Sequence, residues 1–266
     1  MRIARVGVDI AKNAFHLNAV DSQDQKVWSV KLKRGQWLST LSTKADTGVE
    51  VGLEACASAH HWARELSARG FKVKLMAAQF VKPYVKSNKN DEIDAQAICE
   101  AMSRPTMRFV RPKSIVQQDV QATHRIRTEL VTQRTAKVNH IRGLVGEYGL
   151  VAPVGINQLR RALPCWLEDA ENGLSGAFRE LLQGLWADLI QLDERVAQLD
   201  ERINNLVKQD PVAKRLSQLR GVGPITVTAL SVALGDASGF KNGREFAVSL
   251  GLTPKLFCDN YTVWTH

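Results

Sequence analysis

The chain has 266 residues, 44% of them hydrophobic, so it can bury one large core or two smaller ones. It carries 36 Lys and Arg against 27 Asp and Glu, a net charge of +9. No run of 18 apolar residues and no signal-peptide h-region occur. This excludes a membrane span and predicts a cytoplasmic protein.

The first 80 residues alternate strand-like runs with one helical pattern. Period-2 or short apolar runs fall at 5–10, 15–20, 25–32, 49–54 and 71–76, and residues 60–69 have helical spacing. Three strands in close succession, followed by alternating helix and strand, favour an RNase H-like mixed sheet. We therefore predict an α/β domain over residues 1–112.

Two helices and an irregular segment are expected next. Residues 88–102 have a helical pattern with Asn90 as its cap, and prolines at 105 and 112 mark the exit from the first domain. A long helix is predicted over 117–148, whereas 149–176, which holds two prolines, is expected to be irregular.

A strict heptad pattern then runs over four heptads. Its apolar positions are spaced 3,4,3,4 with charges between them, which favours a coiled-coil helix in a domain spanning 113–210. Pairing with a second copy of the chain is the simplest arrangement, and a core-facing helix is the alternative. The seam consists of Leu182, Leu185, Leu189, Leu192, Val196, Leu199, Ile203 and Leu206.

Four acids are candidate metal ligands. Asp9 and Glu54 each lie at a predicted strand end, and Asp91 and Asp94 share one helix face because they are three residues apart. Converging carboxylates would suit two Mg²⁺ or Mn²⁺ ions that cleave a phosphodiester. Solvated acids at ordinary positions are the alternative interpretation.

Positive charge is concentrated between residues 72 and 142, with 14 Lys and Arg against 6 Asp and Glu. A basic band of this kind suits a polyanion, because each neutralised phosphate releases counterions. A solvated basic surface would have the same composition. The candidate nucleic-acid-binding residues in the band are Lys82, Lys86, Lys89, Arg125, Arg134, Lys137 and Arg142.

A Gly-rich turn stands in the last part of the chain, residues 211–266. Arg220, Gly221 and Gly223 belong to the string LRGVGPI, which an apolar helix follows. The pattern is similar to a helix-hairpin-helix, in which glycines let backbone amides approach a phosphate. A plain helix–turn–helix connection is the alternative.

The four cysteines at 56, 99, 165 and 258 are widely separated and include no CxxC pair. We therefore expect free thiols and no zinc knuckle.

Several strings, taken in order, resemble the DEDD-type transposases of bacterial insertion sequences, relatives of the Piv invertase with a RuvC-like nuclease domain. They begin with VGVDIAK at 6–12, GLEA at 52–55 and KNDEIDA at 89–95. GVGP at 221–224 and LGLTPK at 250–255 follow. Each string is modest, but the ordered set covers nearly the whole chain.

The resemblance implies a function and its parts. Asp9, Glu54, Asp91 and Asp94 would correspond to the D, E, D and D metal ligands of a magnesium-dependent DNA recombinase. It also implies a coiled coil between the nuclease domain and a partial C-terminal domain, a homo-oligomer at work, and a bridge RNA that guides recombination. DNA and a structured RNA would then be the partners.

One departure concerns the C-terminal segment. After LGLTPK, family members continue into a Ser- and Gly-rich segment with a proposed nucleophilic serine. Here residues 256–266 contain no serine, and Ser249 precedes the string. We therefore expect a shortened member that is impaired in strand exchange.

Three other functions compete with this interpretation. A truncated protein that binds nucleic acid or a partner without catalysis would keep the basic band and the seam. A RuvC-type nuclease fits the acids but neither the coil nor the GVGP string. Sugar kinases share an RNase H-like core, but no glycine follows Asp9 in this sequence.

Overall fold

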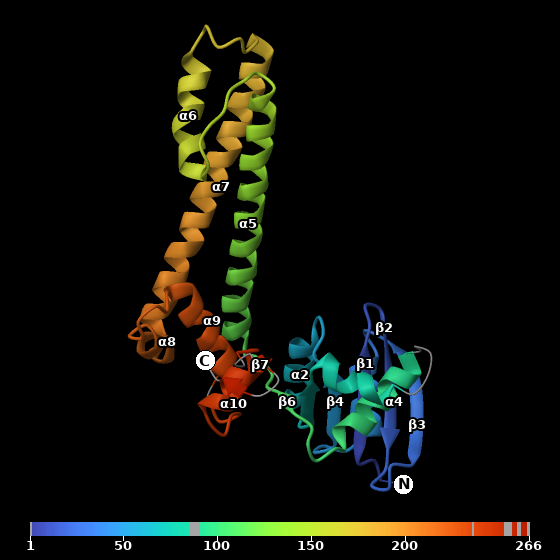
Figure 1. Ribbon diagram of the computed structural model, residues 1–266. Helices are drawn as coiled ribbons and strands as arrows, with labels where there is room; N and C mark the ends of the chain where they lie inside the picture. Colours follow the sequence, from blue (N-terminus) through green and yellow to red (C-terminus); the bar gives the residue numbers. More distant parts are fainter. Residues whose placement is uncertain (1, 86–90, 236, 253–256, 260–261, 265–266) are drawn as a thin grey trace. The chain divides into compact units, whose positions relative to one another are not determined.

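The computed structural model describes residues 2–85, 91–235, 237–252, 257–259 and 262–264 (Figure 1). It is a mixed α/β chain that divides into two compact units, Met1–Ile115 and Val116–His266. The expected division into 1–112, 113–210 and 211–266 stays a prediction. No helix in these described ranges is long and apolar enough to cross a membrane.

The first unit contains a six-stranded mixed sheet in the order β3-β2-β1-β4-β5-β6. The first three strands are antiparallel neighbours, β4 and β5 run parallel to β1, and β6 is antiparallel to β5. The expected mixed sheet is therefore present. Its strands are β1 (Arg5–Ile10), β2 (Ala14–Val20), β3 (Lys26–Lys33), β4 (Glu50–Glu54), β5 (Lys72–Met76) and β6 (Phe109–Val110).

One face of the sheet packs against α1 (Trp37–Lys44) and α2 (Ala59–Ala68). Alternate strand residues such as Val6 and Val8 enter this core, as the period of two requires. Its centre is aromatic, because the Phe15 ring stacks on Trp37 at 4.9 Å. The sequence pattern did not predict α1.

The other face of the sheet is covered by α4 (Asp91–Met102), with α3 (Ala78–Val81) and the short helix η1 (Lys82–Tyr84) beside it. The first turn of α4 is acidic, which favours a helix N-terminus. Its predicted cap, Asn90, lies outside the described residues. The sheet is thus the middle layer between two layers of helix.

The second unit is helical and is built around two long antiparallel helices, α5 (Ile115–Gly146) and α7 (Gly176–Gln209), which lie side by side (Figure 1). Ion pairs show their direction: Arg127 contacts Asp200, whereas Lys137, further along α5, contacts Asp188. A third helix, α6 (Ile156–Glu168), packs against the C-terminal part of α5 and the N-terminal part of α7, and the three helices share one apolar core.

The heptad seam on α7 has two kinds of position. Leu182, Leu189, Val196 and Ile203 are buried, and the core that contains the first two also contains residues of α5 and α6. The alternate positions of the seam are only half-buried: Leu185, Leu192, Leu199 and Leu206. The seam therefore packs, at least on one side, within the chain. Pairing with a second copy stays a prediction.

Segment 149–176 was wrongly expected to be irregular, since it contains α6. The helix includes Pro164, although proline disfavours a helix interior. Leu159 and Leu163 are completely buried on one side of it. Packing of this amphipathic face outweighs the local cost, because tertiary contacts supply most helical stability in proteins.

The chain ends in short elements. These are α8 (Pro211–Leu216), α9 (Pro224–Leu234), α10 (Gly243–Ser249) and a two-stranded sheet of β7 (Phe257–Asp259) and β8 (Thr262–Trp264). Three of the four cysteines, Cys56, Cys99 and Cys165, are free thiols, as expected.

Candidate active site

Asp9 and Glu54 occupy neighbouring positions at one end of the sheet. The parallel pairing of β1 with β4 aligns Val8 with Leu53, one residue before each acid. Val8 and Leu53 are buried in the core beside α1 and α2. Successive strand residues point to opposite faces, so Asp9 and Glu54 both face the α4 side. Both are partly buried.

Two strand glycines set the position of α4 on that face. A Cβ added to Gly7 would lie 2.3 Å from the Ala95 carbonyl oxygen and 2.9 Å from the Cys99 amide nitrogen. A Cβ on Gly52 would lie 2.6 Å from Met102 Sδ. Only glycine permits so close an approach, which brings the middle and the C-terminal turn of α4 onto the strands that carry Asp9 and Glu54. The acidic first turn contacts the neighbouring strands β2 and β3.

Asp91 contacts residues that lie beside Asp9 in the sheet, in one row of paired residues across β1, β2 and β3. Across the three antiparallel strands, Asp9 pairs with His16 and His16 pairs with Lys31. Asp91 Oδ2 lies 3.4 Å from His16 Nδ1 and 3.3 Å from Lys31 Nζ. His16 is thus a neighbour of both acids, and Asp94 lies one helical turn after Asp91.

The thiol of Cys56 lies close enough to Asp9 and Glu54 for the charges of both carboxylates to affect it. Loss of hydration raises the pKa of the Cys56 thiol, and the negative charges of Glu54 and Asp9 raise this pKa further. Two carboxylates therefore contribute to the electrostatic potential at this end of the sheet.

The donor set fits a hard divalent cation, because carboxylate oxygens are the ligands that Mg²⁺ and Mn²⁺ take. Within the described ranges, however, no three His, Cys, Asp or Glu side chains are grouped closely enough to hold a metal ion. The four-carboxylate metal site stays a prediction. In the structure, Lys31 and His16 neighbour the carboxylate of Asp91.

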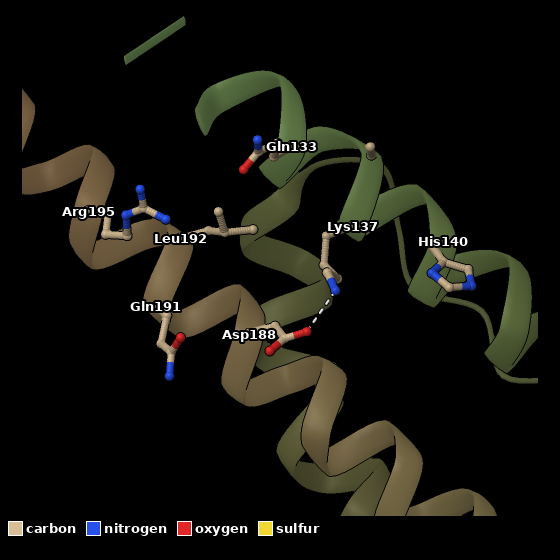
Figure 2. A pocket seen from close by; sticks show the side chains of 8 residues that line it. Gln133, Lys137, His140, Asp188, Gln191, Leu192 and Arg195 are labelled. Atoms are coloured by element: carbon tan, nitrogen blue, oxygen red, sulfur yellow. Dashed lines mark hydrogen bonds and ion pairs between the residues drawn. The ribbon is translucent and has the colours of Figure 1, made fainter. Parts of the chain in front are cut away.

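Parts of the basic band make contacts inside the second unit. Lys137 Nζ lies 2.7 Å from Asp188 Oδ2 in a cleft of about 550 Å³ between α5 and α7 (Figure 2). Arg134 Nη1 lies 3.3 Å from Asp193 Oδ1 on α7. These two cations form ion pairs between α5 and α7, so part of their charge is already neutralised.

The remaining band residues differ in exposure. Arg142 donates to the carbonyl oxygens of Ala152 and Pro153 at 2.6 Å, whereas Lys82 and Arg125 are exposed. Lys86 and Lys89 lie outside the described residues. Nucleic-acid binding by these residues stays a prediction.

The GVGP string forms the turn between α8 and α9. Gly221 has φ = +85°, a conformation that favours glycine, and Pro224 occupies the first turn of α9. Gly223 is the N-cap of α9, and the exposed side chain of Arg220 lies beside the turn. A turn between two helices, which both interpretations of the string require, is present, and phosphate binding there stays a prediction.

Sequence reasoning missed His16 and Lys31, whose contacts link the sheet to Asp91. A signal was available, because a tight three-strand meander aligns residues at predictable positions. Register counted from the turn at residues 11–13 puts His16 in the row of Asp9. The pairing of Lys31 could not be counted in the same way, because the register of β2 with β3 shifts between Ala19 and Val20.

Comparisons with known proteins identify the family of the chain. A DEDD transposase model of the IS110 type, described as "Transposase", matches residues 6–149, and one described as "Transposase IS116/IS110/IS902 family" matches residues 213–257. A probable family 20 transposase of Pseudomonas aeruginosa is 43% identical over 96% of this chain and 75% of its own length. The transposase for insertion sequence element IS1111A of Coxiella burnetii is 39% identical over 94% of this chain and 68% of its own length. The transposase for IS1328 of Yersinia enterocolitica is 36% identical over 96% and 75%, respectively. The chain therefore belongs to the IS116/IS110/IS902 family of insertion-sequence transposases.

Proposed function

We propose that the chain is a DNA recombinase whose first unit cleaves DNA strands with bound Mg²⁺ or Mn²⁺. The observation that carries the proposal is the placement of Asp9 and Glu54 on the sheet face under α4, whose first turn holds Asp91 and Asp94. The strand order β3-β2-β1-β4-β5, with the first three strands antiparallel, supports an RNase H/RuvC-like fold.

Asp9, Glu54, Asp91 and Asp94 would hold the divalent cation. When bound, the cation would stabilise negative charge on the phosphate and activate the attacking oxygen. The role of the chain is to fix the carboxylates: the backbone of β1 and β4 positions two of them, and the close packing of α4 at Gly7 positions the others.

The other proposed partners follow from the second unit and from the family. DNA is the proposed substrate, because the relatives are transposases of insertion sequences. A structured guide RNA would share the basic surface, and the chain would work as a homo-oligomer. The half-buried positions of the α7 seam are the proposed surface for the second copy.

A cleavage assay tests the central function. The full chain is incubated with a DNA substrate carrying the element end, guide RNA and Mg²⁺, and nicked strands are counted. Asp9→Asn should abolish nicking, because it removes a charged ligand while keeping the shape of the side chain. Asp46→Asn, an exposed acid in the loop before β4, is the matched control and should cleave as the wild type does.

Two results would contradict the proposal. Full activity of the Asp9→Asn variant would exclude this carboxylate from the chemistry. A wild-type chain that binds the nucleic acids but shows no metal-dependent cleavage would favour the non-catalytic interpretation.

A further inference from the structure

Four cations gather at the same end of the sheet as Asp9 and Glu54, outside the band between residues 72 and 142. In the sheet register, Lys33 at the end of β3 pairs with Ala14, which follows the turn after β1. Lys12 lies in that turn, and Arg34 directly follows β3. We call this group the β3 rim: Lys12, Lys31, Lys33 and Arg34.

Two members of the β3 rim point to the same face as the carboxylates. Lys31 shares the row of Asp9, and Lys33 lies two residues further, on the same side of the strand. Leu32, between them, packs against the core on the opposite face. Lys31 Nζ lies 3.3 Å from Asp91 Oδ2, so the β3 rim directly adjoins one of the proposed metal ligands.

Arg34 is held in place by contacts that leave it exposed. Its Nη1 donates to the Lys12 carbonyl oxygen at 3.3 Å, and its guanidinium lies 5.2 Å from the centre of the Trp62 ring. Trp62 belongs to the core beside α1 and α2, so Arg34 flanks the end of the sheet from the side opposite to Lys31 and Lys33. Its backbone amide donates to the Asn13 carbonyl oxygen at 3.0 Å. A fixed, exposed guanidinium can bind a phosphate with little loss of side-chain entropy.

The β3 rim could also protect an edge strand. β3 is the edge of the sheet, and lysines on edge strands prevent pairing with another chain. Edge protection requires charged side chains along β3. It does not account for Lys12, which lies in the turn between β1 and β2. It also gives no reason for Arg34 to be fixed by a ring and a carbonyl.

We infer that the β3 rim binds the sugar-phosphate backbone of the nucleic-acid strand that enters the carboxylate site. The inference rests on the proposed function, because it names the path of the strand to that site. Phosphates are the chemical group recognised, in DNA or in RNA. Lys12, Lys33 and Arg34 hold the backbone, and Lys31 is the member of the rim that contacts Asp91.

Binding measured without metal tests the inference apart from cleavage. The full chain is titrated in EDTA against a labelled DNA duplex and, separately, a labelled single-stranded RNA, at a series of salt concentrations. The variant is Lys12→Gln/Lys33→Gln/Arg34→Gln. Its matched control, Lys44→Gln, removes a cation that contacts Trp28 at the opposite end of the sheet.

The triple variant should bind more weakly, and its log–log salt slope should fall by roughly 0.9 per lost phosphate contact on duplex DNA and roughly 0.7 on single strands. The control should keep the wild-type slope. The nucleic acid whose slope changes identifies the strand at the rim. If the triple variant folds poorly, the same titration is carried out with Lys33→Gln alone, because Lys33 is exposed at the end of its strand.

A second measurement asks whether the strand continues into the site. Without metal, the carboxylates repel phosphate, so Asp9→Asn should tighten binding in EDTA. Unchanged affinity of Asp9→Asn, or a wild-type salt slope for the rim variants on both nucleic acids, would overturn the inference. Aggregation of the rim variants with a wild-type slope would assign the lysines to edge protection. None of these outcomes depends on cleavage, so the proposed function can fail or stand separately.

Discussion

Replacing Gly7 with alanine should separate α4 from the sheet and damage the acidic site. The new Cβ would lie 2.3 Å from the Ala95 carbonyl oxygen and 2.9 Å from the Cys99 amide nitrogen. Both are backbone atoms, so no side-chain rotation relieves the clash. The first turns of α4 must retreat by roughly 1 Å to restore ordinary van der Waals separation.

Overpacking of this kind costs about 1–3 kcal/mol, and the rigid obstacle places Gly7→Ala at the upper end. Gly52→Ala should cost less, because the nearest atom is Sδ of the flexible Met102 side chain, at 2.6 Å. Gly35→Ala is the control, since a Cβ there meets nothing within 4 Å. Urea unfolding of the three variants gives the free energies of unfolding.

The same shift should weaken divalent-cation binding more than the loss of stability alone explains. Mn²⁺ titration of the folded Gly7→Ala variant, followed by electron paramagnetic resonance, measures this effect. If Gly7→Ala were as stable as Gly35→Ala and bound Mn²⁺ as the wild type does, the argument that close packing of α4 positions Asp91 and Asp94 would be refuted.

Three further predictions concern the second unit. Loss of hydration, and then the charge of Arg127, lower the pKa of His124 below its ordinary value of 6.5, so the folded state favours the neutral ring. Stability should therefore be complete above pH 6.5 and fall as the pH drops below it, and urea unfolding should show a weaker pH dependence in His124→Gln. Leu189→Ala, at a fully buried seam position, should cost about 2–5 kcal/mol, whereas the half-buried Leu192→Ala should cost less in the same assay. Leu192→Asp/Leu199→Asp should lower the mass in light scattering if the half-buried positions join two copies, and an unchanged oligomer would exclude that surface.

Local patterns predicted the part of the site that lies on strands. Asp9 and Glu54 follow apolar alternation, so their faces and strand ends could be predicted from the sequence. The glycines at 7 and 52 also carried a signal, because glycine inside a strand often marks the close approach of another backbone. The relation of Asp91 to the sheet depends on long-range packing of α4, which spacing alone cannot supply.

The second unit shows where local patterns fail. The seam predicted an apolar stripe on α7 correctly, but spacing does not reveal which surface covers it. The pairing of Lys137 with Asp188 likewise joins residues 51 positions apart. Pro164 suggested irregular structure locally, whereas the burial of Leu159 and Leu163 stabilises a helix there.

The most direct test of the carboxylate site is a crystal structure with Mn²⁺ and bound DNA, read from anomalous difference density. We predict a peak at the end of the sheet, with carboxylate oxygens of Asp9 and at least one of Glu54, Asp91 and Asp94 at coordination distances of about 2–2.6 Å. Loss of that peak in Asp9→Asn would support it further. A Mn²⁺ peak held by other residues, or none beside Asp9 at saturating Mn²⁺, would contradict the account.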